Sequence, residues 1–130
     1  MVKGQAWAEA LQESANASDD FVTMSRWLDL RLLIRFGSAA YWFKIYRGQI
    51  IDAAPYNPVS NMLGYQVVVA GEAAAWRRSL EGVGRFGVES TTGQITGDGD
   101  RVEVERSHAA VQVLGGQVIP RCGLPSDMEG

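Results

Sequence analysis

The chain has 130 residues, a formal net charge of −3 at pH 7 and 46% hydrophobic residues, so it can fold as one domain around its own core. Its acidic balance, with no basic run longer than Arg77-Arg78, argues against nucleic-acid binding. The single cysteine, Cys122, excludes a disulfide or a cysteine metal cluster within one chain and fits a reducing compartment.

Neither end of the sequence carries a recognisable targeting signal. The N-terminal stretch meets acidic residues too early, and has too short an apolar run, for a signal peptide or a membrane span. The final residues SDMEG are not a peroxisomal address. We therefore expect a soluble cytoplasmic protein of bacterial type.

Two helices are predicted before the first strand. Residues 4–16 have the apolar spacing of an amphipathic helix, with Trp7 and Leu11 on its stripe. A second, short helix is predicted from Ser18, whose hydroxyl is suited to cap it, to about Trp27.

The segment 28–54 is the predicted centre of a sheet. From Leu28 to Phe36 every second residue is apolar, which is the period of a strand with one buried face. Breaks at Gly37 and Gly48 favour tight antiparallel turns on either side of a second strand. In that strand one face carries Tyr41, Phe43 and Ile45, and the other carries Trp42, Lys44 and Tyr46. So aromatic a sheet must be covered on at least one face, and the helices at the two ends of the chain are left to cover it.

A loop rich in proline and asparagine, 55–61, separates this meander from a fourth strand at 65–70. That strand runs into a helix whose apolar stripe contains Trp76, expected to point at the sheet. Residues 83–92 are rich in glycine and are predicted as a loop with room for one helical turn, anchored by Phe86 and Val88.

A short strand is predicted at 93–98, followed by an ambiguous segment. Residues 100–114 fit a strand by alternation and a helix by spacing, and a cap at Asp98 or Asp100 favours the helix. Gly115-Gly116 is the expected helix stop. The domain is therefore assigned to 1–116 and a partly ordered tail to 117–130.

Catalytic signatures are weak in this sequence. The single histidine, His108, excludes a two-histidine metal site within one chain, and no serine lies in a nucleophile-elbow motif. The letters GVGRFG at 82–87 follow a helix rather than a strand, which favours a flexible turn over a nucleotide-binding loop. We assign no catalytic residue, metal ligand or cofactor.

Two polar side chains have both a functional and a structural interpretation. Asp52 stands among apolar residues and could be a general base whose pKa rises on burial, or a solvated residue near a strand end. His108 could meet a ligand, or could be a polar ring at the edge of the core.

Four stretches in order resemble the sterol carrier protein 2-like family: AWAEALQESANASDDF, RLLIRFGSAAYWFKIYRGQIIDA, YQVVVAGEAAAWRRSLEG and GQITGDGDRVEVERSHAAVQVL. The likeness covers most of residues 5–115 and rests on hydrophobic spacing and glycines. It implies an α+β fold in which a five-stranded, mainly antiparallel sheet is covered by N-terminal, central and C-terminal helices. Sheet and helices would enclose an apolar tunnel for a lipid, fatty acyl chain, sterol or polyprenoid.

We therefore expect a non-catalytic carrier of a hydrophobic small molecule. Burial of a long chain at ~0.8 kcal/mol per CH₂ would give micromolar affinity without specific polar contacts. The residues expected to line the tunnel are Phe36, Trp42, Phe43, Trp76, Phe86, Val104, His108 and Val111.

Two other functions stay open. The first is a small enzyme of the nuclear transport factor 2-like kind, with Asp52 or His108 as base. The second is an accessory subunit of a larger oxidoreductase, with the region of Tyr46 and Tyr56 as its interface. A membrane or enzyme partner and a homodimer are compatible with any of these.

Overall fold

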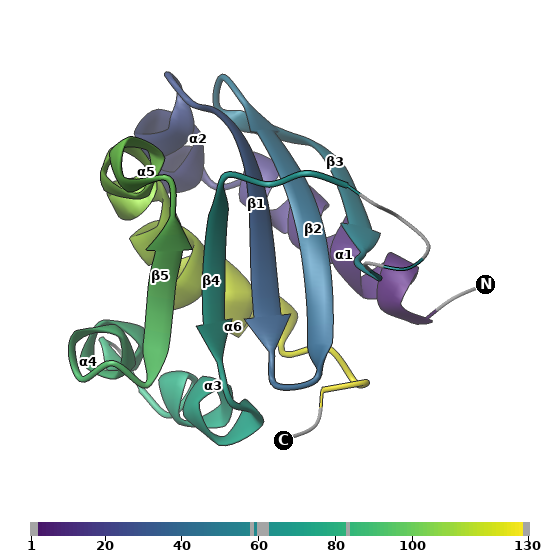
Figure 1. The fold of residues 1–130 in the computed structure, drawn as a ribbon, viewed down its shortest axis with the longest axis vertical. Coiled ribbons are helices and arrows are strands. Elements are labelled where there is room, and N and C mark those ends of the chain that lie inside the picture. Colours follow the sequence, from purple (N-terminus) through teal and green to yellow (C-terminus); the bar gives the residue numbers. More distant parts are fainter. Residues whose placement is uncertain (1–2, 58, 60–62, 83, 129–130) are drawn as a thin grey trace.

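The five predicted strands form one sheet in a computed structural model, which describes residues 3–57, 59, 63–82 and 84–128 (Figure 1). The strands are β1 (Asp29–Phe36), β2 (Ala39–Tyr46), β3 (Gln49–Pro55), β4 (Val67–Gly71) and β5 (Ile95–Gly99). Their order is β3-β2-β1-β4-β5. β1 and β4 are parallel and the other neighbours antiparallel, so the prediction of a mainly antiparallel sheet is confirmed.

Helices cover one face of this sheet, here called the inner face, and the other face is the outer face. In Figure 1, α1, α2, α5 and α6 lie behind the sheet, and the chain leading into β4 crosses the front of β1 and β2. The helices are α1 (Lys3–Asn16), α2 (Asp19–Ser25), α3 (Ala73–Ser79), α4 (Arg85–Thr91), α5 (Arg101–Val113) and α6 (Ile119–Cys122). A π-helical segment, η1 (Leu114–Val118), joins α5 to α6. None of the helices described here has the length and apolar character needed to cross a bilayer.

Alternation along β1 and β2 separates the two faces as predicted. The inner face carries the buried core residues Leu30, Leu32, Ile34, Phe36, Tyr41, Phe43 and Ile45. A two-residue turn joins β2 to β3, and both Arg47 (φ 46°) and Gly48 (φ 90°) take the left-handed conformation. Turns of this hand match the twist of the strands they connect, which fixes the register of the hairpin.

On the outer face, Leu33 and Trp42 are buried although no helix covers them. They are paired in register on β1 and β2. The Trp42 indole donates to the carbonyl of Gly64 at 2.8 Å, so the chain entering β4 is held across them. Of the predicted loop 55–61, positions 58, 60 and 61 lie outside the described residues.

Side-chain amides of α1 occupy the free edge of β3. Asn16 donates to the Ile50 carbonyl at 3.0 Å and accepts from the Ile50 N–H at 2.7 Å. Gln12 donates to the same carbonyl at 2.9 Å, and Gln5 donates to the carbonyl of Ala53 at 3.0 Å. These bonds replace the strand partner that an edge strand lacks.

Three local predictions differ from the structure. Residues 85–91, expected as a loop with one helical turn at most, form the seven-residue helix α4 because Phe86 is buried and anchors one face of it. Gly115 and Gly116 do not stop α5, and the chain continues through η1 into α6 because Val118 and Ile119 are core residues. The helix therefore crosses the expected boundary at residue 116.

The segment after α6 packs on the domain. The Trp7 indole donates to the Gly123 carbonyl at 3.0 Å, and the Tyr41 hydroxyl donates to Asp127 at 2.7 Å. Met128 is buried in the core. Residues 117–128 are thus continuous with the domain's packing, whereas a partly ordered tail was expected.

Candidate functional site

A partly enclosed cavity of about 140 Å³ lies between strands β4 and β5 and helices α4 and α5. Strand alternation turns Val67 and Val69 inward, and helical spacing places Val104, His108 and Val111 on the side of α5 that faces them. Its lining consists of Val67, Val69, Phe86, Ser90, Ile95, Thr96, Gly97, Val104, Ser107, His108, Val111 and Gln112. We call it the α5 cavity.

The polar side chains of the α5 cavity are all neutral hydrogen-bonding groups or an imidazole. They are Ser90, Thr96, Ser107, His108 and Gln112. No carboxylate, lysine or arginine is among the described residues that line it. Such a lining suits an apolar molecule with at most a neutral polar end, because a charged head would lose water without gaining a partner.

A second, deeper hollow of about 10 Å³ lies below the α5 cavity. Val69, Phe86 and Val111 line both spaces, so these three side chains form the partition between them. Beyond the partition are Leu32, Ile34, Trp76, Leu114, Gly115 and Ile119. The deeper walls are therefore entirely apolar.

Phe86 fills a notch in the last long helix. A Cβ atom on Gly115 would lie 2.3 Å from Cε1 of the Phe86 ring, so only glycine admits the ring here. On its other side Phe86 lies against Trp76, with ring centroids 5.8 Å apart. A π-helical turn at this contact is a deviation that is frequent at functional sites.

The helix that carries Phe86 is bounded by two left-handed glycines. Gly84 (φ 81°) is its N-cap, and Gly93 (φ 80°) follows its C-cap. Glu89, 3% exposed, accepts from Arg78 of α3 at 2.9 Å and from Arg85 at 3.2 Å. The pair with Arg78 fixes α4 to α3, and the glycines allow the chain to turn on either side of it.

Of the eight residues expected to line a tunnel, the structure brings four together in the α5 cavity: Phe86, Val104, His108 and Val111. Trp76 lines the deeper hollow. Phe36 and Phe43 are fully buried core residues, and Phe36 packs against Trp76 at 4.5 Å between centroids.

Trp42 lies on the outer face, away from the other seven. The reason is its phase in β2, where Tyr41 and Phe43 point inward and Trp42 points outward. A cavity that is lined by Trp76 therefore cannot also be lined by Trp42.

Sequence reasoning missed several lining residues. Val67, Val69 and Ile95 come from β4 and β5, and the alternation of β4 had already marked the first two as one face. Ser90 could not be anticipated because α4 was expected to be a loop. The buried Glu89 had no signal beyond being a carboxylate near two arginines.

The two candidate bases lie at opposite sides of the molecule. Asp52 is exposed on the edge strand β3, where its carboxylate accepts from the N–H of Ala53 at 2.9 Å. His108 is exposed at the rim of the α5 cavity, beside the other edge strand, β5. No three His, Cys, Asp or Glu side chains of the described residues come together in a metal-binding arrangement.

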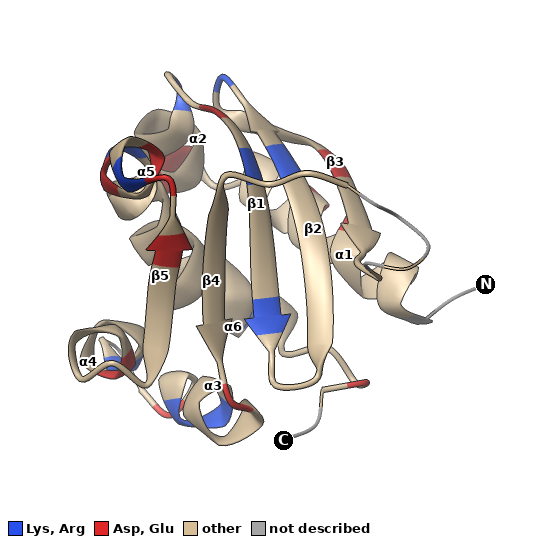
Figure 2. Cartoon of the chain, in the orientation of Figure 1, with Lys and Arg blue, Asp and Glu red and all other residues tan. Residues whose placement is uncertain are grey.

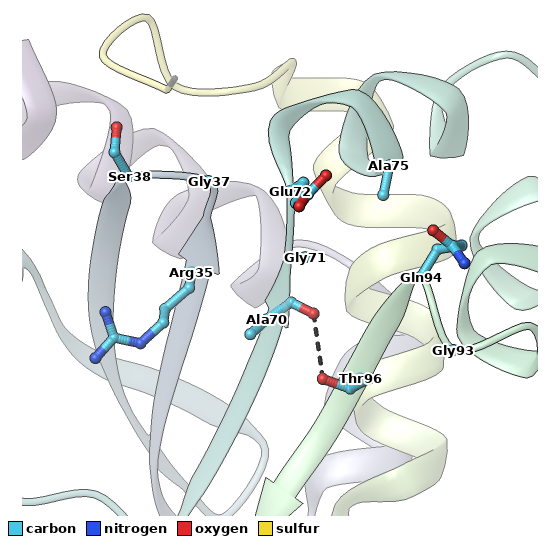
Figure 3. A pocket seen from close by; sticks show the side chains of 10 residues that line it. All are labelled: Arg35, Gly37, Ser38, Ala70, Gly71, Glu72, Ala75, Gly93, Gln94 and Thr96. Carbon is cyan, nitrogen blue, oxygen red and sulfur yellow. Dashed lines mark hydrogen bonds between the residues drawn. The ribbon is translucent and has the colours of Figure 1, made fainter. Parts of the chain in front are cut away.

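A wider, open hollow of about 730 Å³ lies where β1 and β4 end and β5 begins (Figure 3). Its lining is Arg35, Gly37, Ser38, Ala70, Gly71, Glu72, Ala75, Gly93, Gln94 and Thr96. Small and polar side chains of this kind offer little apolar surface to a hydrophobic molecule. For such a ligand we therefore assign the candidate site to the α5 cavity.

Comparisons with solved structures identify the fold. A crystal structure of sterol carrier protein 2 superimposes with a TM-score of 0.70 at 16% sequence identity, covering 91% of this chain and 99% of that one. A solution structure from Thermus thermophilus, described as a conserved hypothetical protein and possibly a sterol carrier protein, also has a TM-score of 0.70 at 16% identity, covering 100% and 94%.

A third similar structure is described as a UbiJ-SCP2 ubiquinone synthesis protein. It has a TM-score of 0.53 at 14% identity and covers 82% of this chain and 86% of that one. No protein-family model matches the sequence, and no curated protein is significantly similar to it in sequence. The chain has the fold of sterol carrier protein 2, as its sequence pattern predicted.

Proposed function

We propose that this protein binds and carries a hydrophobic small molecule, with the α5 cavity as the entrance to the binding site. The observation that supports this most is the partition of Val69, Phe86 and Val111, because it separates a surface cavity from an entirely apolar hollow. The fold shared with sterol carrier protein 2 agrees with such a role.

The site has to enlarge for a lipid-sized ligand. Small-molecule pockets usually measure about 300–1,000 Å³, and the α5 cavity has about 140 Å³. Withdrawal of Phe86 from its notch at Gly115 would join the cavity to the deeper hollow. The glycines at 84 and 93 provide the hinges for that movement, so α4 is the element we expect to shift when the ligand enters.

The cargo that fits best is neutral at its polar end. A rim without a carboxylate, lysine or arginine among the described residues favours a hydroxyl, carbonyl or quinone over a carboxylate or phosphate. The similar structure described as a ubiquinone synthesis protein gives a reason to include a polyprenyl quinone among the probes. A sterol and a fatty acid are the natural comparisons.

The test is ligand binding by variants that change the cavity volume. Val111→Phe should fill the cavity and lower the affinity for a short-chain ubiquinone or a sterol by about tenfold or more, since it displaces apolar contacts. Val102→Phe is the matched control, because Val102 lies on the same helix and is exposed. Phe86→Ala should raise affinity by removing the partition.

A second measurement is mass spectrometry of an organic extract of the purified protein, which should release a co-purifying lipid. An empty extract, together with no bound ubiquinone, sterol or fatty acid at millimolar probe, would overturn the proposal. Equal binding by Val111→Phe and the wild type would place the ligand elsewhere on the chain.

The structure argues against the nuclear transport factor 2-like alternative. The sheet order and the superposition identify the sterol carrier protein 2 fold instead. Asp52 lies at the opposite edge of the sheet from the α5 cavity, so of the two candidate bases only His108 could act there.

A further inference from the structure

Trp27 is 76% exposed, although the other three tryptophans are buried or half-buried. It lies in the connection from α2 to β1, and the guanidinium of Arg26 stacks over its ring at 5.2 Å from the centroid. The cation–π contact is itself favourable, so it keeps the exposed indole and the guanidinium together as one aromatic–basic pair.

A second tip of the chain repeats this arrangement next to the first. Tyr46, 41% exposed, lies at the β2–β3 turn with the Arg47 guanidinium 5.4 Å from its ring centroid. The Arg47 N–H donates to the Leu28 carbonyl at 2.7 Å, and the Gly48 N–H donates to the Ser25 carbonyl at 3.0 Å. These bonds hold the two tips side by side, and we call residues 26–27 and 46–47 the paired tips.

The two arginines of the paired tips have no carboxylate of the described residues in direct contact, although the charge of Arg47 acts on Asp29 together with that of Lys44. The nearby Asp29 is bound by Lys44, and Glu103 is bound by Arg106. Figure 2 shows basic positions at the ends of both connections, in a chain of net charge −3.

The paired tips are also joined to the helix that forms the α5 cavity. Arg106 of α5 donates to the backbone carbonyl of Trp27 at 3.4 Å. The next two residues of that helix, Ser107 and His108, line the cavity. A surface that covered the paired tips would therefore lie close to the middle of α5, where Arg106 makes this contact.

We propose that the paired tips dock the protein on an anionic lipid bilayer. Tryptophan and tyrosine settle at the level of lipid headgroups, where their rings are half in hydrocarbon and half in water. Arginines beside these rings attract anionic headgroups. Each further basic residue near such a surface strengthens the attraction by a similar amount. The bilayer need not supply cargo for this contact, so the inference stands apart from the proposed function.

A bilayer fits this surface better than a protein partner does. Specific protein interfaces bury about 800 Å² or more on each side. Two partly exposed rings, of about 150–250 Å² each when complete, fall well short of that area. The two rings and their arginines are instead the size of a membrane anchor with weak, reversible binding.

The experiment is co-sedimentation with vesicles of equal parts phosphatidylglycerol and phosphatidylcholine, at low ionic strength and at 0.5 M NaCl. The wild type should bind, and binding should fall in high salt or on vesicles of phosphatidylcholine alone. Trp27→Ala should weaken partitioning by about tenfold, the scale of burying one large apolar side chain. Arg26→Gln with Arg47→Gln should weaken it by about fivefold per charge.

The control variants remove residues of the same kind, apolar or basic, from exposed positions outside the paired tips. Ile51→Ala deletes another exposed apolar side chain, and the double variant Arg77→Gln with Arg121→Gln deletes two exposed arginines. Both variants should bind vesicles like the wild type. Val111→Phe should also bind normally, which separates this test from that of the cavity.

Two outcomes would overturn the proposal. One is binding that Trp27→Ala and the arginine pair leave unchanged. The other is absence of vesicle binding by the wild type. A concentration-dependent dimer that Trp27→Ala abolishes would then assign the surface to a second copy of the chain.

Discussion

The ring of Phe86 rests on the backbone of Gly115, where a Cβ atom would lie 2.3 Å from Cε1. Gly115→Ala must therefore displace the ring, at about 1–3 kcal/mol of overpacking. Gly116→Ala is the matched control in the same π-helical segment, since nothing lies within 4 Å of its Cβ position. It should be neutral or stabilising by up to about 1 kcal/mol. Urea unfolding of both variants measures the difference, and equal stability would contradict the contact.

The edge of β3 supplies a second prediction about stability. Asn16→Ala removes two hydrogen bonds and leaves the N–H of Ile50 without its acceptor, for an expected loss of about 1–3 kcal/mol. Gln12→Ala should cost less, because Asn16 still donates to the Ile50 carbonyl that Gln12 shares. Thermal unfolding of the two variants should rank them in this order, and the reverse order would show that the amides are not equivalent to a strand partner.

Glu89 should contribute more to the stability of the domain than its position on a short surface helix suggests. Glu89→Gln keeps the shape but removes the charge that Arg78 and Arg85 bind, so we expect a loss of about 1–2 kcal/mol. The value is below that of a fully buried pair because both arginines are partly exposed. Glu81→Gln, at an exposed position, is the control. Faster proteolysis near residues 84–93 in Glu89→Gln alone would show that the pair holds α4 in place.

The ionisation of Tyr41 should make the stability of the protein depend on pH above pH 10. Burial, together with its hydrogen bond to Asp127, raises the pKa of the Tyr41 phenol above the ordinary value of 10.0. Above pH 10 the unfolded chain loses the phenol proton while the folded chain keeps it. The stability that Tyr41 contributes is therefore complete below pH 10 and is lost as the pH rises further.

The measurement is urea unfolding at pH 8 and pH 10.5. Tyr41→Phe should be less stable at pH 8, by about 1 kcal/mol for the lost hydrogen bond. Its deficit should shrink at pH 10.5, because phenylalanine does not ionise. Tyr65→Phe removes a half-exposed phenol and serves as the control. A deficit that grows with pH would mean that the sign of the linkage is wrong.

Much of the sheet could be predicted because its signals are local. The alternation along β1 and β2, and the left-handed position at Gly48, are properties of short stretches of sequence. The helix α5 was ambiguous, and the Asp100 cap, which accepts from the N–H of Glu103 at 3.1 Å, decided it correctly. The fold that the resemblance to the sterol carrier protein 2-like family implied is confirmed by the superpositions.

The features that could not be predicted depend on distant partners. Nothing near Gly115 indicates that its missing side chain admits a ring from residue 86, so a packing glycine was interpreted as a helix stop. Trp42 was placed in the cavity because its residue type was weighed above its phase in the strand. The coverage of Trp42 by Gly64 requires knowing where the chain into β4 passes.

The mixed sheet also divides the domain into two parts whose contacts we expect to form at different stages of folding. β1, β2 and β3 are joined by tight turns, so their contacts are local and can form early. β4, β5 and the cavity helices α4 and α5 attach to them through the parallel pairing of β1 with β4, which has to wait for a long loop to close. Amide hydrogen exchange should accordingly find the meander most protected and the cavity half opening at lower free energy. If the α5 cavity admits a ligand as we propose, the half of the domain that opens more easily is the half that holds the binding site.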